Sequence, residues 1–409
     1  MIPQGLQFSD RIDGISGSAI REIFKMLTRP NMISFAGGNP SADALPDKEC
    51  ADLAREVLLS DGKRILQYGA TEGYPPFLVS LLSYLQKTFA PYGIPAEKIG
   101  ISNVLPTTGS TQGMDILCKA FINPGDAILV ESPTFLGNMQ SLRIYQSQLI
   151  PVDSDENGLI PTKLEEAVQK HKPKMLYTIP TFQNPSGCTL SAERREPIAR
   201  LAEKYGFLVV EDDPYRDLRY EGEPLPPIKS YDCSGHVVYM GSFSKLISPG
   251  LRVGYLLAQE DILRKCIIGK QSTDLHTPNL TQAIVHEYLR RDMLTPHLQA
   301  IFPMYREKMQ LMLKELESFP KGISYTRPEG GLFIFVTMPK SFNATEAFSQ
   351  AVARGVAYVP GTYFYPEGGH DNTFRLNFSN STLEQIHTGM GILRTLFEEK
   401  LTQKSGQAI

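Results

Sequence analysis

The chain has 409 residues, and its 42% of hydrophobic and 21% of charged residues are typical of a globular protein that folds in water. This length exceeds what one hydrophobic core usually holds, so we expect a large domain and a smaller one. A net charge of −3 gives no basic surface for DNA or RNA, which excludes nucleic acid as an expected partner.

The N-terminus and the cysteines indicate where the protein works. Residues 1–14 contain no basic stretch followed by an apolar one, and no run approaches the ~18 apolar residues of a membrane helix. The five cysteines are scattered, with no CxxC pair and no histidine at metal-binding spacing. We therefore expect reduced thiols, no metal site, no membrane partner and a cytoplasmic location.

Residues 1–48 are predicted to form an arm rather than a domain. A short helix is expected over residues 18–27, and the loop that follows, ISFAGGNPSADALP, is rich in glycine and proline. Glycine lets a backbone come close to a ligand, so we expect this loop to approach one. Arg21, midway along the helix, is either a ligand for a substrate carboxylate or a solvated charge.

Two helices are predicted next. Apolar residues at helical spacing indicate a core helix over residues 72–89, and Tyr68 in the turn before it is either a phosphate ligand or a packed aromatic. In residues 104–121 a glycine-containing turn leads into the second helix, where the free N–H groups of Ser110 and Thr111 can bind an anion. No GK[ST] or GxGxxG motif follows, so a nucleotide is disfavoured.

Between residues 126 and 260 apolar strands alternate with helices. The expected strands are AILVESP, QLIPVDS, MLYTIP, FLVVEDD, VVYMGS and VGYLLA. This alternation predicts a mostly parallel sheet with helices on both faces, in which ligands bind at the carboxyl ends of the strands. Polar or aromatic residues follow four of these strands: Phe135, Asn184, Asp212 and Lys245.

The segment GSFSKLISPGLRVGY places Lys245 on a loop between two strands, seven residues before Arg252. A lysine has a pKa near ~10.4 in water, but burial beside a cation lowers this pKa and lets the amine form a Schiff base. Ser242, Ser244 and Arg252 can bind a phosphate dianion. An imine-forming amine beside a phosphate site indicates pyridoxal phosphate.

The other groups that this cofactor needs are also present at strand ends. A carboxylate must keep the ring nitrogen protonated, and Asp212, which leaves an apolar strand, is the best candidate, with its neighbour Asp213 as the competitor. Asn184 and Tyr215 can donate to the ring oxygen, and Phe135 can stack on the ring.

The C-terminal part is predicted to be a second α/β domain. RPEGGLFIFVTMP, GVAYVPGTYFYP and FRLNFS are expected to form a small mixed sheet, and Ser381 with Glu384 to cap the last helix as a capping box. We expect the arm to span residues 1–48 and pack with the small domain, the large cofactor-binding domain to span 49–289, and the small domain to span 290–409.

Together these residues resemble the fold-type I pyridoxal-phosphate enzymes, specifically the class I/II aminotransferases, from GGNP to FRLNFS. The resemblance implies a large domain whose sheet is of the mostly parallel, seven-stranded type, and a smaller α/β domain formed by both termini. It implies pyridoxal phosphate as cofactor, with Lys245, Asp212 and Tyr215 as catalytic residues. The further cofactor ligands that it implies are Ser110, Thr111, Phe135, Asn184, Ser242, Ser244 and Arg252.

The resemblance also implies a homodimer, in which Tyr68 reaches the phosphate of the other subunit. Arg375, with Asn184, is expected to bind the substrate's α-carboxylate. SAIREI, ISFAGGNP, TGSTQG and EDDPY are most similar to the group of 2-aminoadipate and kynurenine aminotransferases, where the N-terminal helix and GG loop close over the substrate. That closure places these residues at the specificity pocket: Arg21, Gly37, Gly38 and Asn39. Phe135 departs from the tyrosine often found in that group.

We therefore expect an aminotransferase that moves the α-amino group of an amino acid to a 2-oxo acid such as 2-oxoglutarate. Its donors would be broad: 2-aminoadipate, aromatic and branched-chain amino acids, or glutamate. A pyridoxal lyase or decarboxylase is the alternative, and a non-catalytic ligand sensor is a further one, which the lack of room for a DNA-binding domain in residues 1–48 disfavours. We also expect a cis peptide bond at Ser132–Pro133 or Asn184–Pro185.

Overall fold

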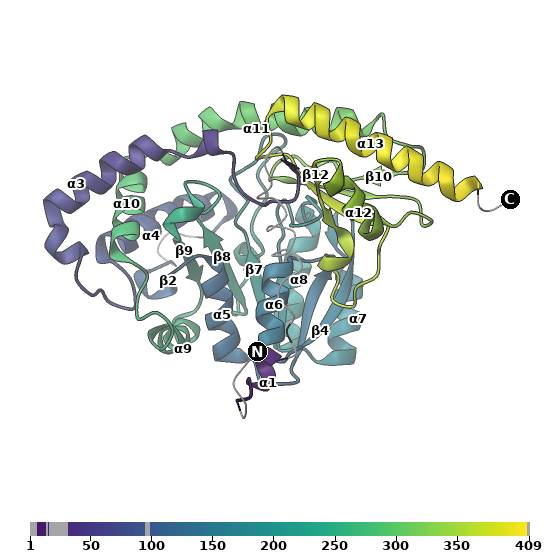
Figure 1. The fold of residues 1–409 in the computed structure, drawn as a ribbon. Coiled ribbons are helices and arrows are strands. Elements are labelled where there is room, and N and C mark those ends of the chain that lie inside the picture. Colours follow the sequence, from purple (N-terminus) through teal and green to yellow (C-terminus); the bar gives the residue numbers. More distant parts are fainter. Residues whose placement is uncertain (1–5, 14, 16–31, 95–98, 407–409) are drawn as a thin grey trace.

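The computed structural model describes residues 6–13, 15, 32–94 and 99–406. The helix predicted over residues 18–27, and Arg21 within it, lie outside the described residues. Figure 1 shows a twisted central sheet surrounded by helices, with a smaller group of strands beside it and long helices along one side of both. This arrangement is the α/β architecture that the sequence predicts.

The large sheet has eight strands in the order β2-β9-β8-β7-β6-β3-β4-β5. Their bounds are Val104–Thr107 (β2), Gly254–Leu257 (β9), Val237–Ser242 (β8), Leu208–Asp212 (β7), Met175–Thr178 (β6), Ala127–Ser132 (β3), Gln148–Asp155 (β4) and Gly158–Leu159 (β5). Neighbours from β8 to β4 are parallel, and β9 is antiparallel to β8 and β2. The mostly parallel sheet is confirmed, and the two-residue β5 adds an eighth strand at its edge.

Both faces of the central strands are buried, because successive residues point into different hydrophobic clusters. Val210 of β7 packs in the main core, while its neighbour Val209 packs in a second cluster with Leu176. The helices that accompany the sheet are α3 (Asp47–Ile65), α4 (Pro75–Phe89), α5 (Ser110–Phe121), α6 (Leu136–Ile144), α7 (Pro161–His171), α8 (Ala192–Tyr205), α9 (Glu260–Gln271) and α10 (Asn279–Arg290). Polar groups on such strands are therefore concentrated at the ends, where the site is expected.

The small sheet is antiparallel throughout rather than mixed. Its order is β10-β11-β14-β13, and its strands span Ser324–Tyr325 (β10), Phe333–Thr337 (β11), Thr373–Asn377 (β14) and Val359–Pro360 (β13). The parallel pairing lies outside it, between β1 (Ile33–Ser34) of the arm and β12 (Val356–Ala357). The prediction of a mixed sheet was wrong because the one parallel partner comes from the opposite end of the chain.

The remaining helices are α1 (Asp10–Asp13), α11 (Leu294–Leu316), α12 (Ala344–Ala353) and α13 (Leu383–Gly406). No helix in the described part of the chain is long and apolar enough to cross a membrane. The division of the chain at residues 48/49 and 289/290 stays a prediction. The pairing of β1 with β12 supports the proposal that the arm packs with the small domain.

The capping box of α13 lies one residue later than the sequence predicts. The backbone N–H of Thr382 donates to Gln385 Oε1 (3.0 Å), and the backbone N–H of Gln385 donates to Thr382 Oγ1 (3.1 Å). The Ser381 hydroxyl instead donates to the carbonyl of Ser34 in the arm. Ser381 and Glu384 were the wrong pair because the spacing of the motif fits both registers, and the contact with the arm selects between them.

Replacing Thr382 by alanine is expected to lower the free energy of unfolding by about 1 kcal/mol, because an orphan N–H of the helix loses its acceptor. Urea unfolding of the purified variant measures this change. Thr395→Ala on the exposed face of the same helix is the control and should change the free energy by less than about 0.5 kcal/mol. Equal losses in both variants would contradict the assigned cap.

Candidate active site

The predicted site residues meet at the carboxyl ends of the parallel strands. Asp212 is the last residue of β7, Asn184 lies on the loop after β6, and Lys245 lies on the loop between β8 and β9. Strands that run in the same direction bring these ends to one edge of the sheet. The Ser132–Pro133 and Asn184–Pro185 peptide bonds on two neighbouring loops are both cis, which confirms that expectation.

Lys245 is held with its amine largely out of water. Its Nζ donates a hydrogen bond to the carbonyl oxygen of Gly38, 2.7 Å away, so the glycine loop of the arm closes over it. Burial lowers the pKa of Lys245 to about 8, and the positive charges of Arg375 and Arg252 lower it further in the same direction. A lysine in this state supplies a neutral amine at a pH only slightly above neutral.

Asp212 is buried and has one oxygen available. Its Oδ2 accepts hydrogen bonds from Tyr177 Oη (2.8 Å) and Asn138 Nδ2 (3.2 Å), whereas its buried Oδ1 has no partner among the described residues. Burial raises the pKa of Asp212 to about 7, and the hydrogen bond from Tyr177 acts against this rise. A cationic N–H placed at Oδ1 would stabilise the ionised carboxylate.

Asp213, the competitor of Asp212, faces a different set of side chains. Its Oδ2 accepts a hydrogen bond from Tyr239 Oη (3.3 Å) and lies 3.9 Å from Arg216. Asp213 follows the end of β7, and its side chain contacts Tyr239 and Arg216, whereas Asp212 contacts Asn138 and Tyr177. The arrangement supports the choice of Asp212.

Arg375 occupies a buried position on β14, facing the carboxyl edge of the large sheet. Its Nη1 donates to Asn184 Oδ1 (2.8 Å), and its guanidinium lies over the ring of Phe333 at 4.4 Å. Burial lowers the pKa of Arg375 to about 10, and its Nε has no partner among the described residues. A buried cation with an unused donor fits a carboxylate ligand.

Asn184 and Tyr215 also lie together. Asn184 Nδ2 is 3.5 Å from Tyr215 Oη, and both residues are buried. Burial raises the pKa of Tyr215, so the phenol keeps its proton and remains a hydrogen-bond donor. The structure therefore brings the side chains of Asn184 and Tyr215 together beside Arg375.

The predicted phosphate cup is assembled around the guanidinium of Arg252. Its Nη1 is 3.5 Å from Ser244 Oγ, and its Nη2 donates to the carbonyl of Thr108 (3.3 Å) in the turn before α5. Gly109 in that turn has a φ of +79°, and a Cβ there would lie 2.4 Å from Arg252 Nη2. The positive φ favours glycine here, and a side chain at this position would also push the guanidinium of Arg252 aside.

The other predicted cup residues lie nearby on the same elements. Ser110 and Thr111 begin α5, and Ser242, the last residue of β8, accepts a hydrogen bond from the backbone N–H of Ser244 (3.2 Å). Phe135 directly precedes α6, at the carboxyl side of β3. Since the free N–H groups of a helix start attract anions, the placement of Ser110 and Thr111 supports the predicted phosphate contacts.

The glycine loop reaches the site from the arm. Gly37 is buried, Gly38 accepts the hydrogen bond from Lys245, and Asn39 is anchored through its carbonyl, which accepts from Ser379 Oγ (2.7 Å). Tyr68 lies apart from these residues: it is 81% exposed and packs edge-on against His276. The structure thus gathers the loop residues but leaves Tyr68 on the outside of this chain.

Sequence reasoning missed two residues that contact Asp212. Asn138 lies on α6 and Tyr177 within β6, and both are buried. Neither follows a strand, which was the signal used for the other site residues. A polar side chain among the apolar residues of a buried helix face, as at Asn138, is the signal that could have found the first.

These geometries fit a pyridoxal-phosphate site. Asp212 Oδ1 is a buried oxygen without a partner among the described residues, and it can accept from a protonated ring nitrogen. The turn at Gly109 and the guanidinium of Arg252 can bind a phosphate. The amine of Lys245 can react with the aldehyde. Among the residues described, no group of three or more His, Cys, Asp or Glu side chains could hold a metal ion. The fold and site define a pyridoxal-phosphate-dependent enzyme of fold type I.

Comparison with known proteins gives the family. The model for aminotransferase class I and II matches residues 30–393. An aromatic-amino-acid aminotransferase of Thermococcus litoralis is 39% identical, covering 96% of this chain and 94% of that protein. The structure of kynurenine aminotransferase from Pyrococcus horikoshii has a TM-score of 0.91 at 37% identity, covering 96% of this chain and 97% of that one.

A second similar structure contains a cofactor adduct. The α-aminoadipate aminotransferase of Thermus thermophilus, in complex with N-(5'-phosphopyridoxyl)-L-leucine, has a TM-score of 0.88 at 35% identity, covering 97% of this chain and 98% of that one. The chain belongs to the class I and II aminotransferase family. It is an aminotransferase that uses pyridoxal phosphate, which confirms the predicted class and cofactor.

Attachment of pyridoxal phosphate to Lys245 in the apoprotein is expected to speed up with pH, with a midpoint near 8, because the amine is neutral above its lowered pKa. Arg375→Met should move this midpoint upward, since one of the cations that lower the pKa of Lys245 is lost. The rate can be followed by visible absorption from pH 6 to 11. A midpoint near the 10.5 of an ordinary lysine would contradict the assigned burial.

Proposed function

We propose that this aminotransferase accepts several amino-acid donors and passes their α-amino group to a 2-oxo acid such as 2-oxoglutarate. The proposed donors are 2-aminoadipate, glutamate, and aromatic and branched-chain amino acids. The contact that carries the proposal is that of Arg375 with Asn184 at 2.8 Å, a buried pair that we propose as the ligand of the substrate's α-carboxylate. The names of the similar enzymes, which include aromatic-amino-acid, kynurenine and α-aminoadipate aminotransferases, support a broad donor range.

When bound, pyridoxal phosphate supplies an aldehyde that links to amines and a ring that accepts electrons from the substrate's α-carbon. We propose that Asp212 holds the ring nitrogen, that Asn184 and Tyr215 donate to the ring oxygen, and that Phe135 stacks on the ring. The proposed phosphate ligands are Ser110, Thr111, Ser242, Ser244 and Arg252.

Lys245 is proposed as the residue that moves the proton. As a neutral amine with a pKa near 8, Nζ can take a proton from the substrate's α-carbon and give one back within the working pH range. Its distance of 2.7 Å to the Gly38 carbonyl limits its movement in the absence of substrate. Arg375 orients the α-carboxylate, so the bond to be broken is presented to this amine.

We propose that the arm selects the substrate by contacting its side chain. Gly38 and Asn39 lie on the glycine loop that covers Lys245, and this position supports their role in the specificity pocket. Arg21, the proposed partner of an acidic side chain, lies outside the described residues. The ranking of donors, rather than the contacts of the loop, therefore tests this part of the proposal.

We also propose a homodimer whose subunits share their active sites through Tyr68. Large apolar side chains that precede Tyr68 in the chain are strongly exposed, including Leu59 at 76% and Leu66 at 75%. Strongly exposed leucines on a single chain support a surface that another subunit covers. A cytoplasmic location is proposed as well, supported by five cysteines that form no disulfide.

The central experiment mixes the purified holoenzyme with each donor in turn: glutamate, 2-aminoadipate, kynurenine, leucine and phenylalanine. Loss of the visible band of the lysine-bound cofactor, with a 2-oxo acid product that depends on added 2-oxoglutarate, is expected for more than one donor. Lys245→Ala should lower turnover by at least about 10⁴-fold, because the proton-moving group is lost. Product formation without an acceptor would indicate a lyase instead.

Tyr68→Phe should weaken cofactor binding about 10-fold, because a hydrogen bond to a charged phosphate is lost. The decisive measurement mixes this variant with Lys245→Ala under conditions that allow subunit exchange. If Tyr68 serves the partner's site, statistical exchange creates intact sites in about a quarter of all positions, and activity at limiting cofactor rises above the sum of the two variants. No rise after verified exchange would contradict a shared site.

A further inference from the structure

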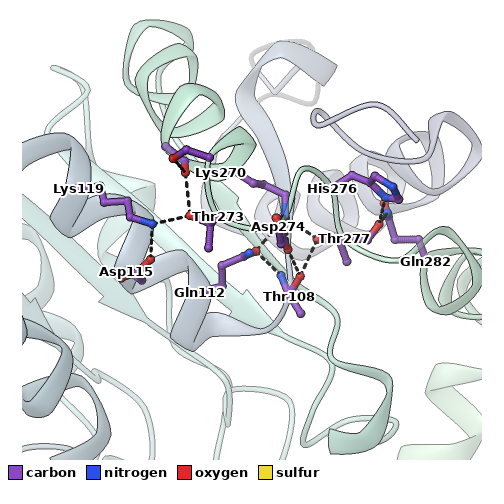
Figure 2. Close-up of polar contacts among 12 residues, drawn as sticks. Thr108, Gln112, Asp115, Lys119, Lys270, Thr273, Asp274, His276, Thr277 and Gln282 are labelled. Carbon is purple, nitrogen blue, oxygen red and sulfur yellow. Dashed lines mark hydrogen bonds and ion pairs between the residues drawn. The ribbon is translucent and has the colours of Figure 1, made fainter. Parts of the chain in front are cut away.

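A fully buried lysine lies behind the phosphate cup, outside the site described so far. Lys270 of α9 has an exposed fraction of 0%. Its Nζ donates to Gln112 Oε1 (2.9 Å), to Asp274 Oδ1 (2.9 Å) and to Thr277 Oγ1 (3.0 Å), as Figure 2 shows. An ammonium has three donors, so each of them has an acceptor and the charge is fully compensated by hydrogen bonds.

The acceptors of Lys270 are also the partners of Thr108. The Thr108 hydroxyl donates to Asp274 Oδ2 (2.6 Å), and its backbone N–H donates to Gln112 Oε1 (2.7 Å). Its carbonyl accepts from Arg252 Nη2 (3.3 Å). Thr108 is therefore fixed between two cations, the buried Lys270 on one side and the guanidinium of the phosphate cup on the other.

Thr108 opens the turn from which α5 begins. The next residue, Gly109, has a φ of +79°, a backbone angle that regular structure does not maintain. Ser110 then starts α5, with its N–H among the free donors of the helix end. A rotation of the turn would re-aim these donors, and the hydrogen bonds of Thr108 oppose it. The direction of the N–H groups at the start of α5 thus depends on the hydrogen-bond partners of Thr108, which are Asp274 and Gln112.

We propose that Lys270 and Asp274 are positioning residues that hold the turn of residues 108–110 in the conformation that receives the phosphate of pyridoxal phosphate, without touching the cofactor. The inference rests on the proposed placement of the phosphate at this turn. Donors that are already aimed at an anion need no rearrangement when it binds, so their affinity for it is higher. Losing the support should therefore weaken recognition of the phosphate in particular.

The same network extends to the segment that carries Tyr68. The Thr277 carbonyl accepts from Gln282 Nε2 (2.7 Å), and Gln282 Oε1 accepts from the backbone N–H of Tyr74 (2.9 Å). Tyr74 follows the turn of Tyr68 by six residues in the chain. Both proposed sources of phosphate contacts, the turn before α5 and the Tyr68 segment, are thus attached to the residues around Lys270.

The test compares two ligands that differ only in the phosphate, pyridoxal phosphate and pyridoxal. Lys270→Met in the full-length apoprotein should bind pyridoxal phosphate at least about 10-fold more weakly, while its affinity for pyridoxal changes less than about 2-fold. Equilibrium titration by visible absorption measures both constants. A general structural defect would weaken both ligands alike, because the aldehyde and ring contacts are common to them.

Lys119→Met is the matched control. Lys119 lies on α5, like Gln112, and its polar partners in the described part of the chain are Asp115 and Thr273, next to Asp274 (Figure 2). This substitution removes a lysine from the same region but leaves the hydrogen bonds of Thr108 in place. In this variant, the ratio of the affinity for pyridoxal phosphate to that for pyridoxal should stay within about 2-fold of the wild-type ratio.

Thr108→Val provides a second variant in case Lys270→Met does not fold. Valine keeps the shape of threonine but removes the hydroxyl that donates to Asp274. We expect a loss of about 3- to 10-fold for pyridoxal phosphate and none for pyridoxal. Equal losses for both ligands, or an unchanged preference for the phosphate in every folded variant, would overturn the inference.

The wild-type titration separates this inference from the proposed site itself. A wild-type protein that binds both ligands equally would show that the phosphate is not held at the turn, and the proposed placement would fail with the inference. A strong wild-type preference for the phosphate that survives in Lys270→Met and Thr108→Val would overturn the inference alone.

Discussion

The active site depends on keeping the amine of Lys245 out of water. Removal from water favours the neutral form of an amine, and the nearby charges of Arg375 and Arg252 act in the same direction. Within the described part of the chain, the hydrogen bond of this amine goes to the carbonyl of Gly38 in the arm. An open arm would let water reach Nζ. The reactivity of Lys245 therefore depends on docking of the arm.

Arg375 connects the parts of the chain that surround Lys245. It lies on β14 of the small sheet, donates to Asn184 on the loop after β6, and donates to the carbonyl of Ala36 in the arm. The rings of Phe333 and Phe364 flank its guanidinium and replace the water that would otherwise surround it. One buried cation thus joins the arm, the small sheet and the edge of the large sheet at the site.

The sequence predicts the parts of the structure that have a local signal. Continuous apolar strands followed by polar residues located Asp212, Asn184 and Lys245, because the end of a buried strand is where polar groups gather. Asn138 and Lys270 have no such signal, because each lies within a helix and bonds to a residue far away in the chain: Asn138 to Asp212 and Lys270 to Gln112. The antiparallel small sheet and the parallel β1–β12 pair likewise depend on segments that only folding brings together.

The balance of charges at the site also indicates how substrate binding acts on Lys245. Among the described residues, the buried guanidinium of Arg375 keeps an Nε without a partner, so it can still take up a carboxylate. If the carboxylate of a substrate pairs with Arg375, as proposed, it compensates a charge that lowers the pKa of Lys245. The pKa of the amine then rises, so the substrate that presents its α-proton also makes the proton acceptor a stronger base.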